Sequence, residues 1–461
     1  MGRYTKQDVI DLVRENDVEF IRLQFSDLFG TMKNVAITAR QLEKALDNKC
    51  TFDGSSVDGF VRIEESDMYL YPDLDSFAIF PWNAGGNRVA RLICDVYGQD
   101  GLPFAGDPRN VLKRVMVECQ KMGYKFNVGP ECEFFLFHTD EEGRPTTVSH
   151  EKAGYFDVAP LDLGESARRD MILNFGSIRP RVGAFMKELN ETLWRLGVSA
   201  KTQHNEVAPA QHEIDFKYDN ALRTADNILT FKFIVKYIAK RHGLYASFMP
   251  KPITGVDGSG MHLNMSLWKN GKNIFADSKN DLGISEEAFH FMAGVMEHAN
   301  EMCLITNPLV NSYKRIVPGY EAPVDVSWSP SNRSPLIRVP AARGSGTRLE
   351  FRSPDSAANP YLALAVSLAA GLDGIKRKLT PGKGSMKNQY EMAEGEKQEA
   401  GINTLPRDMK EALEIFKQST YMKELLGDHI FNKYVEAKSA EWESYQKFVS
   451  QWEVDRYLYK I

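Results

Sequence analysis

The sequence predicts an α+β protein with two domains, a small unit of about 100 residues and a larger region after it. Three observations support this fold class. The length of 461 residues exceeds that of one typical domain. The first hundred residues mix strand-like and helix-like patterns, and the remainder combines convincing helices with strands that carry unusual polar side chains.

Composition excludes several classes of protein. Hydrophobic residues make up 43% and charged residues 26% of the chain, which suits a well-packed core and argues against wholesale disorder. The net charge is −5, from 57 basic and 62 acidic residues. Nucleic-acid-binding proteins usually carry an excess of basic residues, and this chain does not. Its charge therefore gives no reason to expect a nucleic-acid partner.

The cysteines and the apolar segments indicate the compartment. The five cysteines are widely spaced and form no C-x-x-C pair, so we expect buried, reduced thiols rather than disulfides or a zinc site. The N-terminus carries charges where a signal peptide needs an apolar run. The longest apolar run, 361–372, is only about half the length that spans a bilayer. We expect a cytoplasmic protein without membrane contact.

The first domain alternates between two kinds of pattern. Apolar residues follow helical spacing over 5–16, where Thr5 is a suitable cap, and over 39–48. Strand-like segments are expected at 18–27, 31–38 and 89–98. The Gly-, Ser- and Asp-rich stretch 51–60 is expected to be a loop that carries function or, more simply, a surface turn.

The second domain is predicted to begin near the turn-rich stretch 101–110. Helical patterns follow at 111–123, 185–196, 227–243, 285–305 and 359–379. Residues 383–404 are polar and predict a mobile loop, whereas 405–461 are predicted to be helical.

Four strand-like segments in this region carry the functional argument, and the stretch 347–355, TRLEFRSPD, is the most informative of them. Because strand side chains alternate, its Arg348, Glu350 and Arg352 share one face opposite two apolar residues. The other three segments present polar faces of the same kind, made of Glu131 and Glu133; of Glu206, Gln211, Glu213 and Asp215; and of His262, Asn264 and Ser266.

Each segment alone could be a strand with one solvated face, and a lone His262 is more often structural. The set is more specific, because its alternating residues are glutamate, histidine and arginine. If the strands share one sheet face, five glutamates converge and would repel one another without cations. Carboxylates with one imidazole form a hard ligand set that suits Mg²⁺ or Mn²⁺. Six ligands suffice for two ions about 3.5–4 Å or somewhat more apart.

Arginines concentrate in the same part of the chain. They are Arg315, Arg333, Arg338, Arg343, Arg348 and Arg352. Guanidinium groups bind carboxylates and phosphates in a bidentate manner, although any single one could lie on the surface. Metals and arginines around one pocket indicate phosphoryl transfer. The chain has no P-loop motif, and its GSGMH segment precedes a strand rather than the helix of a dinucleotide site.

These segments resemble glutamine synthetase of type I, in the same order and over nearly the whole chain. The matching motifs include FDGSSVDGF, GPECEFFLF, EVAPAQHEIDF, NSYKRIVPGYEAP and RLEFRSPDSAANPYLA. The resemblance implies an N-terminal β-grasp domain (1–105) and a catalytic domain (106–461) with an antiparallel sheet lining the active site. It also implies a homo-dodecamer with active sites between subunits. The expected reaction joins ammonia to glutamate through γ-glutamyl phosphate and consumes ATP.

The resemblance assigns a role to each candidate residue. One metal would be held by Glu133, Glu206 and Glu213, and the other, near ATP, by Glu131, His262 and Glu350. Glutamate would be bound by Arg315, Gly258, Glu321 and Arg352. ATP and the transferring phosphate would be bound by Ser266, Arg333, Arg338 and Arg348.

The remaining roles concern closure and regulation. Asp53 would accept a proton from ammonium across the subunit boundary, supported by Asp67. Glu321 would close a flap that excludes water. Arg62 matches the arginine of feedback inhibition by glutamine in the alpha subtype. Tyr390 lies outside an adenylylation-type sequence, so no adenylylation is expected.

Three departures from the type I pattern stand out. The stretch around 175–213 is similar to type III synthetases, with an added helix-like segment near 173–200. HNE replaces HHE before Glu206, and Asp257 stands where asparagine is usual in VNGSG. Asp257 leaves open a γ-glutamyl ligase for a polyamine or other amine. A catalytically silent binding protein is a third alternative, against which the intact ligands and arginines argue.

Overall fold

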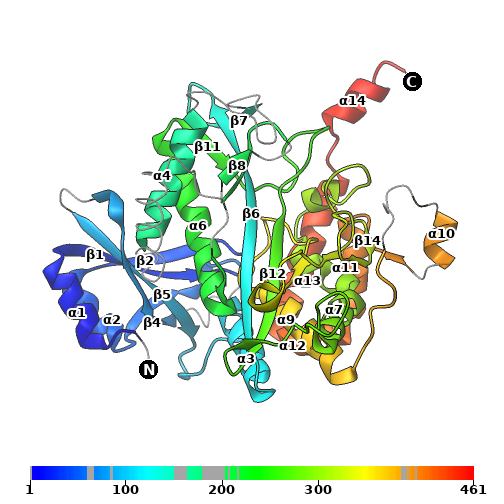
Figure 1. Ribbon diagram of the computed structural model, residues 1–461. Helices are drawn as coiled ribbons and strands as arrows, with labels where there is room; N and C mark the ends of the chain where they lie inside the picture. Colours follow the sequence, from blue (N-terminus) through cyan, green and yellow to red (C-terminus); the bar gives the residue numbers. More distant parts are fainter. Residues whose placement is uncertain are drawn as a thin grey trace, which may run out of the picture.

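The computed structural model describes residues 3–59, 67–83, 87–149, 163–178, 203–205, 208–214, 217–385, 392, 394–399 and 402–460. Figure 1 shows a smaller N-terminal sheet on one side, two long central strands, β6 and β12, and a group of helices on the other side. Within the described residues, no helix combines the length and the apolar character that a bilayer crossing requires.

The N-terminal part is a five-stranded sheet with two helices. Its elements are α1 (Lys6–Glu15), β1 (Val18–Ser26), β2 (Met32–Thr38), α2 (Leu42–Leu46), β3 (Cys50–Asp53), β4 (Asp67–Ile79) and β5 (Arg88–Tyr97). The strand order is β2-β1-β5-β4-β3, and β1 and β5 are parallel while the other pairs are antiparallel. The sheet has its own core, to which Val9, Ile21, Leu70 and Leu92 contribute.

The larger part is built on an eleven-stranded sheet. Its strands are β6 (Lys125–Thr139), β7 (Pro145–Ser149), β8 (Gln203–Asn205), β9 (Gln211–Ile214), β10 (Asp219–Asn220), β11 (Leu244–Ser247), β12 (Met261–Lys269), β13 (Lys272–Asn273), β15 (Trp328–Ser329), β16 (Ile337–Arg338) and β17 (Leu349–Phe351). The main path runs β15-β16-β17-β12-β6-β9-β8. All pairs are antiparallel except β15 with β16, as the predicted fold class requires.

Helices cover this sheet. They are α3 (Pro108–Lys121), α4 (Leu163–Ile178), α6 (Ala221–Arg241), α7 (Glu286–Glu297), α8 (Ala299–Thr306), α9 (Pro360–Arg377), α10 (Glu394–Glu399), α11 (Met409–Gln418), α12 (Thr420–Leu426), α13 (Asp428–Gln446) and α14 (Gln451–Tyr457). A separate small ribbon pairs β14 (Asp325–Val326) with β18 (Asn403–Thr404). The start of α3 is set by Asp107, whose side chain caps the N–H of Arg109, and by Pro108 in the first turn.

Most predicted elements are confirmed, three predictions need correction and one strand was not predicted. The single helix expected over 285–305 is two helices, because the backbone leaves helical geometry at His298, whose side chain hydrogen-bonds Glu301 and Asp373. The expected loop 51–60 begins with the end of β3, and the expected loop 383–404 contains α10 and β18. The sequence analysis missed β4, which contains Pro72 and shifts register between Asp73 and Ala78.

Other predictions have separate outcomes. All five cysteines are buried and none forms a disulfide, as expected. The helix predicted at 185–196 lies outside the described residues. The domain boundary at residue 105 stays a prediction.

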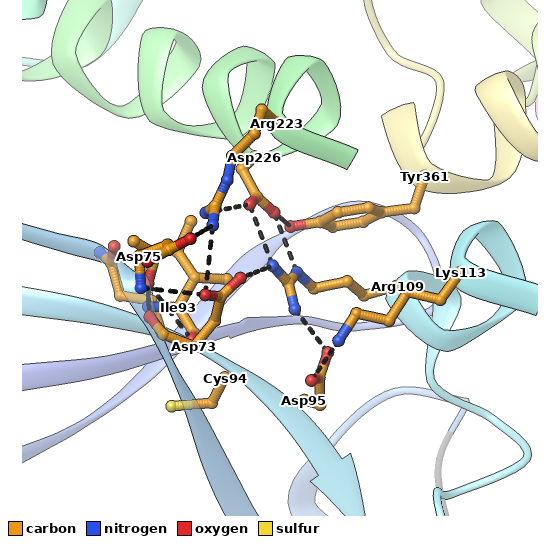
Figure 2. Close-up of polar contacts among 12 residues, drawn as sticks. Asp73, Asp75, Ile93, Cys94, Asp95, Arg109, Lys113, Arg223, Asp226 and Tyr361 are labelled. Atoms are coloured by element: carbon orange, nitrogen blue, oxygen red, sulfur yellow. Dashed lines mark hydrogen bonds and ion pairs between the residues drawn. The ribbon is translucent and has the colours of Figure 1, made fainter. Parts of the chain in front are cut away.

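The two parts are joined by a cluster of charges centred on Arg109 of α3, which is 2% exposed. Its guanidinium binds Asp73 at 2.7 Å, Asp95 at 2.5 Å and Asp226 at 3.0 Å. Asp73 and Asp95 belong to the N-terminal sheet, whereas Asp226 belongs to α6. Figure 2 shows these carboxylates pointing toward the same guanidinium.

Two further residues around Arg109, Arg223 and Tyr361, contact the same carboxylates. Arg223 binds Asp73 at 3.2 Å and Asp226 at 3.5 Å, and the Tyr361 hydroxyl donates to Asp226 at 2.7 Å. Burial acts to raise the pKa of Asp73, but the charges of Arg109 and Arg223 outweigh it and lower that pKa. The cluster therefore ties the N-terminal sheet to α6 and α9 through compensated ionic contacts.

We expect Arg109→Met to lower the free energy of unfolding by about 3–5 kcal/mol, because three carboxylates would lose their shared cation. Urea unfolding of wild type and variant at equal protein concentration measures the change. Lys113→Met is the matched control, because Lys113 is one-third exposed and, among the described residues, its ion-pair partner is Asp95. Its expected cost is below about 1 kcal/mol. Equal effects of the two substitutions would contradict the central role of Arg109.

Candidate active site

The candidate ligands are brought together by the register of four adjacent strands, β17, β12, β6 and β9. His262 of β12 lies directly opposite Glu131 of β6, and Asn264 lies opposite Glu350 of β17. On the far side of β6, Glu133 lies opposite Glu213 of β9. Directly paired residues have Cβ atoms about 5 Å apart. Pairing alone therefore gathers side chains from four segments that span more than two hundred residues of sequence.

Glu131, His262 and Glu350 form the tightest group. Each offers one ligand atom, and these atoms all lie within 4.8 Å of one another. Nδ1 of His262 is 3.0 Å from Oε2 of Glu131 and 4.0 Å from Oε1 of Glu350. Asn264 donates a hydrogen bond of 2.8 Å to the second oxygen of Glu131.

The charges in this group are strongly coupled. Glu350 has no exposed surface and is held by Arg338, whose Nε donates at 2.7 Å, and by Arg352. Burial acts to raise the pKa of Glu131, but the hydrogen bond and charge of His262 outweigh it and bring that pKa to about 2. The carboxylate of Glu131 is therefore anionic at neutral pH.

Glu133 forms the start of a second group beside the first. Its Oε2 accepts hydrogen bonds from the backbone N–H of Gly260 at 2.7 Å and from Gln211 at 3.0 Å. Nε2 of His262 is 3.9 Å from Oε1 of Glu133. The imidazole thus stands between the two predicted ligand sets. Glu206, the third member of the second set, lies outside the described residues, as does Asp215.

This donor set fits divalent metal. It consists of buried or half-buried carboxylates and one imidazole, which are ligands that Mg²⁺ and Mn²⁺ accept. Nε2 of His262 is buried and has no hydrogen-bond partner among the described residues. A buried nitrogen without a partner is costly unless something occupies that position.

The backbone beside His262 has no room for side chains. A Cβ on Gly260 would lie 2.5 Å from Nη2 of Arg315 and 2.8 Å from Nε2 of His262. A Cβ on Gly258 would lie 2.2 Å from the carbonyl oxygen of Pro250. Arg315 is 2% exposed and donates to the carbonyls of Ser353 at 2.9 Å and Arg352 at 3.2 Å. Sequence analysis singled out Gly258 but missed Gly260, although both belong to the GSG motif.

A cavity of about 220 Å³ opens beside Glu131. It is lined by Ser266 and Arg348, both predicted to lie on the nucleotide side, and by Asn264, to which Arg348 donates at 2.8 Å. Two aromatic residues that sequence analysis missed, Tyr218 and Trp268, also line it, with their rings 6.3 Å apart. Tyr218 and Trp268 are far apart in the sequence, so no local pattern predicted that their rings would lie close together.

Three of the remaining candidates, Arg343, Arg333 and Glu321, are exposed. Arg343, one of the clustered arginines, donates to the backbone carbonyls of Leu282, Pro340 and Ala342.

The candidates of the N-terminal part belong to a different sheet from the ligand group. Asp53 and Asp67 are exposed and pair with each other at the edge of the N-terminal sheet. Hydrogen bonds from Ser55 lower the pKa of Asp53. Arg62 and Tyr390 lie outside the described residues, so their roles stay predictions.

We expect Glu350→Gln to weaken Mn²⁺ binding at least about tenfold, since even residues that only support ligands change metal affinity that much. Electron paramagnetic resonance titration of free Mn²⁺ measures the affinity without any turnover. Glu118→Gln is the control, because Glu118 is half-exposed and forms an ion pair with Lys121 on the surface of α3. Unchanged affinity in the Glu350 variant would rule out this residue as a ligand.

Comparison with known proteins identifies the family. Residues 105–457 match the family described as glutamine synthetase, catalytic domain, and residues 17–99 match glutamine synthetase, beta-Grasp domain. The chain is 58% identical over 460 residues to a glutamine synthetase of Clostridium saccharobutylicum, covering 100% of both chains. It is 52% identical over 456 residues to one of Staphylococcus aureus strain Mu50, covering 99% of this chain and 98% of that one.

Solved structures agree with this match. A structure titled GmaS/ADP complex-Conformation 1 superposes with a TM-score of 0.82 at 30% identity, covering 98% of this chain and 99% of that one. A cryo-EM structure of Plasmodium falciparum glutamine synthetase has a TM-score of 0.82 at 24% identity over 99% of each chain, which supports the fold alone. With two family matches that together span nearly all of its length, this chain belongs to the glutamine synthetase family.

Proposed function

We propose that this glutamine synthetase joins ammonia to glutamate with ATP at the face of β6, β12 and β17. The observation that carries the proposal is the convergence of Glu131, His262 and Glu350 beside two arginines and next to a cavity. A γ-carboxylate oxygen of glutamate attacks the γ-phosphorus of ATP, and ADP leaves. Ammonia then attacks the acyl carbon of γ-glutamyl phosphate, and phosphate leaves as glutamine forms.

Each side chain has a proposed part in these steps. Arg315 binds the α-carboxylate of glutamate and Gly258 lies against its amino group. Arg352 orients the γ-carboxylate, and Arg338 and Arg333 neutralise the transferring phosphate. Ser266 and Arg348 bind the nucleotide, consistent with their positions on the cavity beside Glu131.

The chemistry depends on charge neutralisation. Two or more Mg²⁺ or Mn²⁺ ions, when bound by Glu131, His262 and Glu350 and by Glu133, Glu206 and Glu213, would offset the charge of the phosphates. Arg338 and Arg352 both contact Glu350. Arg338, proposed to neutralise the phosphate, and Arg352, proposed to orient the γ-carboxylate, therefore both lie beside a proposed metal ligand.

We further propose a homo-dodecamer whose active sites form between subunits. Support comes from Asp53, the proposed proton acceptor, whose carboxylate is exposed and hydrogen-bonds Ser55 and Ser56 of its own loop. A neighbouring subunit would bring Asp53 to the site. The buried cysteines, none of which forms a disulfide, support a cytoplasmic location.

The amine substrate is tested by measuring ADP release with Mg²⁺ and glutamate present. We expect turnover with ammonium and at least about a hundredfold less with putrescine or ethanolamine, because a closed flap leaves no room for a larger amine. Faster turnover with either larger amine would favour the alternative γ-glutamyl ligase. No turnover with any amine would refute both enzymatic functions.

Shared active sites are tested by mixing two inactive variants. We expect Asp53→Asn and Glu133→Gln to be inactive separately. Mixed oligomers from co-expression should recover about a quarter of wild-type activity, since random assembly in a symmetric ring restores both residues at that fraction of interfaces. No recovery would indicate that each chain supplies its own Asp53.

A further inference from the structure

Asp257, which departs from the family pattern, contacts the residue proposed to close the active site. Its Oδ1 accepts a hydrogen bond of 2.9 Å from the backbone N–H of Glu321. Asp257 lies in the segment 251–259 and Glu321 in the segment 316–324, and neither segment contains a helix or strand. Their relative position therefore depends on side-chain contacts.

The Asp257 segment is also fixed to the metal-binding face. Nε2 of Gln211 donates to Oε2 of Glu133 and to the carbonyl oxygen of Gly258, both at 3.0 Å. The N–H of Ser259 donates to the carbonyl of Pro250 at 2.8 Å. One amide group thus links a proposed metal ligand to the residue that follows Asp257.

A second set of contacts holds the two segments together. Nζ of Lys251 lies 3.4 Å from the centre of the Tyr320 ring and also donates to the carbonyl of Val256. The side chain of Asn311 exchanges two hydrogen bonds with the backbone of Lys251, at 2.7 and 3.0 Å. Lys251 thus holds Tyr320 in place. The hydrogen bond to Asp257 holds Glu321, which follows Tyr320 in the chain.

We propose that Asp257 is a positioning residue that couples the Glu133 side of the site to the Glu321 segment and keeps this segment closed over the acyl phosphate. This inference rests on the proposed role of Glu321. A carboxylate is a stronger acceptor for an N–H group than the amide of asparagine, because the hydrogen bond is charge-assisted. When the segment opens, water attacks the acyl carbon, phosphate leaves, and glutamate is regenerated. ATP is then consumed without glutamine formation.

Hydrogen exchange tests the contact directly. In Asp257→Ala, the backbone amide of Glu321 loses its acceptor, and we expect its exchange to become about fivefold faster. Asp257→Asn keeps a carbonyl oxygen at this position and should give an intermediate rate. Thr254→Ala is the matched control, since Thr254 is an exposed residue of the same segment. Unchanged exchange in both Asp257 variants would overturn the proposal.

The ratio of ADP to glutamine tests the consequence. We expect one ADP per glutamine in wild type and Thr254→Ala, and an excess of ADP in Asp257→Ala with unchanged Mn²⁺ affinity. A ratio of one in Asp257→Ala would refute the positioning role even if exchange is faster. If wild type shows no Mn²⁺- and glutamate-dependent turnover and forms no glutamine, the proposed function itself is refuted. If wild type forms glutamine and Asp257→Ala keeps a ratio of one, only the Asp257 proposal is refuted.

Discussion

The antiparallel register of β6, β12 and β17 is the constraint on which the candidate site depends. The same strands bury Cys132, Phe134, Leu263 and Met265 completely on the opposite face. A slip of one residue would move every side chain of a strand to the other face. Burial of these apolar residues therefore holds the register that aligns His262 with Glu131. The hydrophobic core thus determines the geometry of the polar face.

The second requirement is compensation of charge. Glu350 is fully buried, and Arg338 and Arg352 form ion pairs with it. An uncompensated buried carboxylate would become protonated and lose its value as a metal ligand. The same principle holds the two parts of the molecule together, where Arg109 is shared by carboxylates of the N-terminal sheet and of α6. Arginine side chains therefore compensate buried carboxylates both at the candidate site and at the contact between the two parts of the molecule.

Much of this site could be predicted from the sequence because the strands are long and strongly periodic. The ligand atoms of Glu131, His262 and Glu350 lie within 4.8 Å of one another, as strand alternation suggested, and their role as metal ligands stays a prediction. The errors fall where local pattern is weak or misleading. At the helix break, the side chain of His298 hydrogen-bonds Glu301 and Asp373, and Asp373 belongs to another helix. β4 contains a proline and an irregular register, both of which obscure its period.

The sequence by itself determined the ligand types, the strand faces and the family, because periodicity and motif order are local properties that the chain displays directly. Only the tertiary structure decided which strands pair, that Arg343 binds backbone carbonyls, and that Asp257 meets the N–H of Glu321. Asp257 and Glu321 lie 64 positions apart. Contacts over such separations follow from the packing of the whole core, which no local pattern encodes.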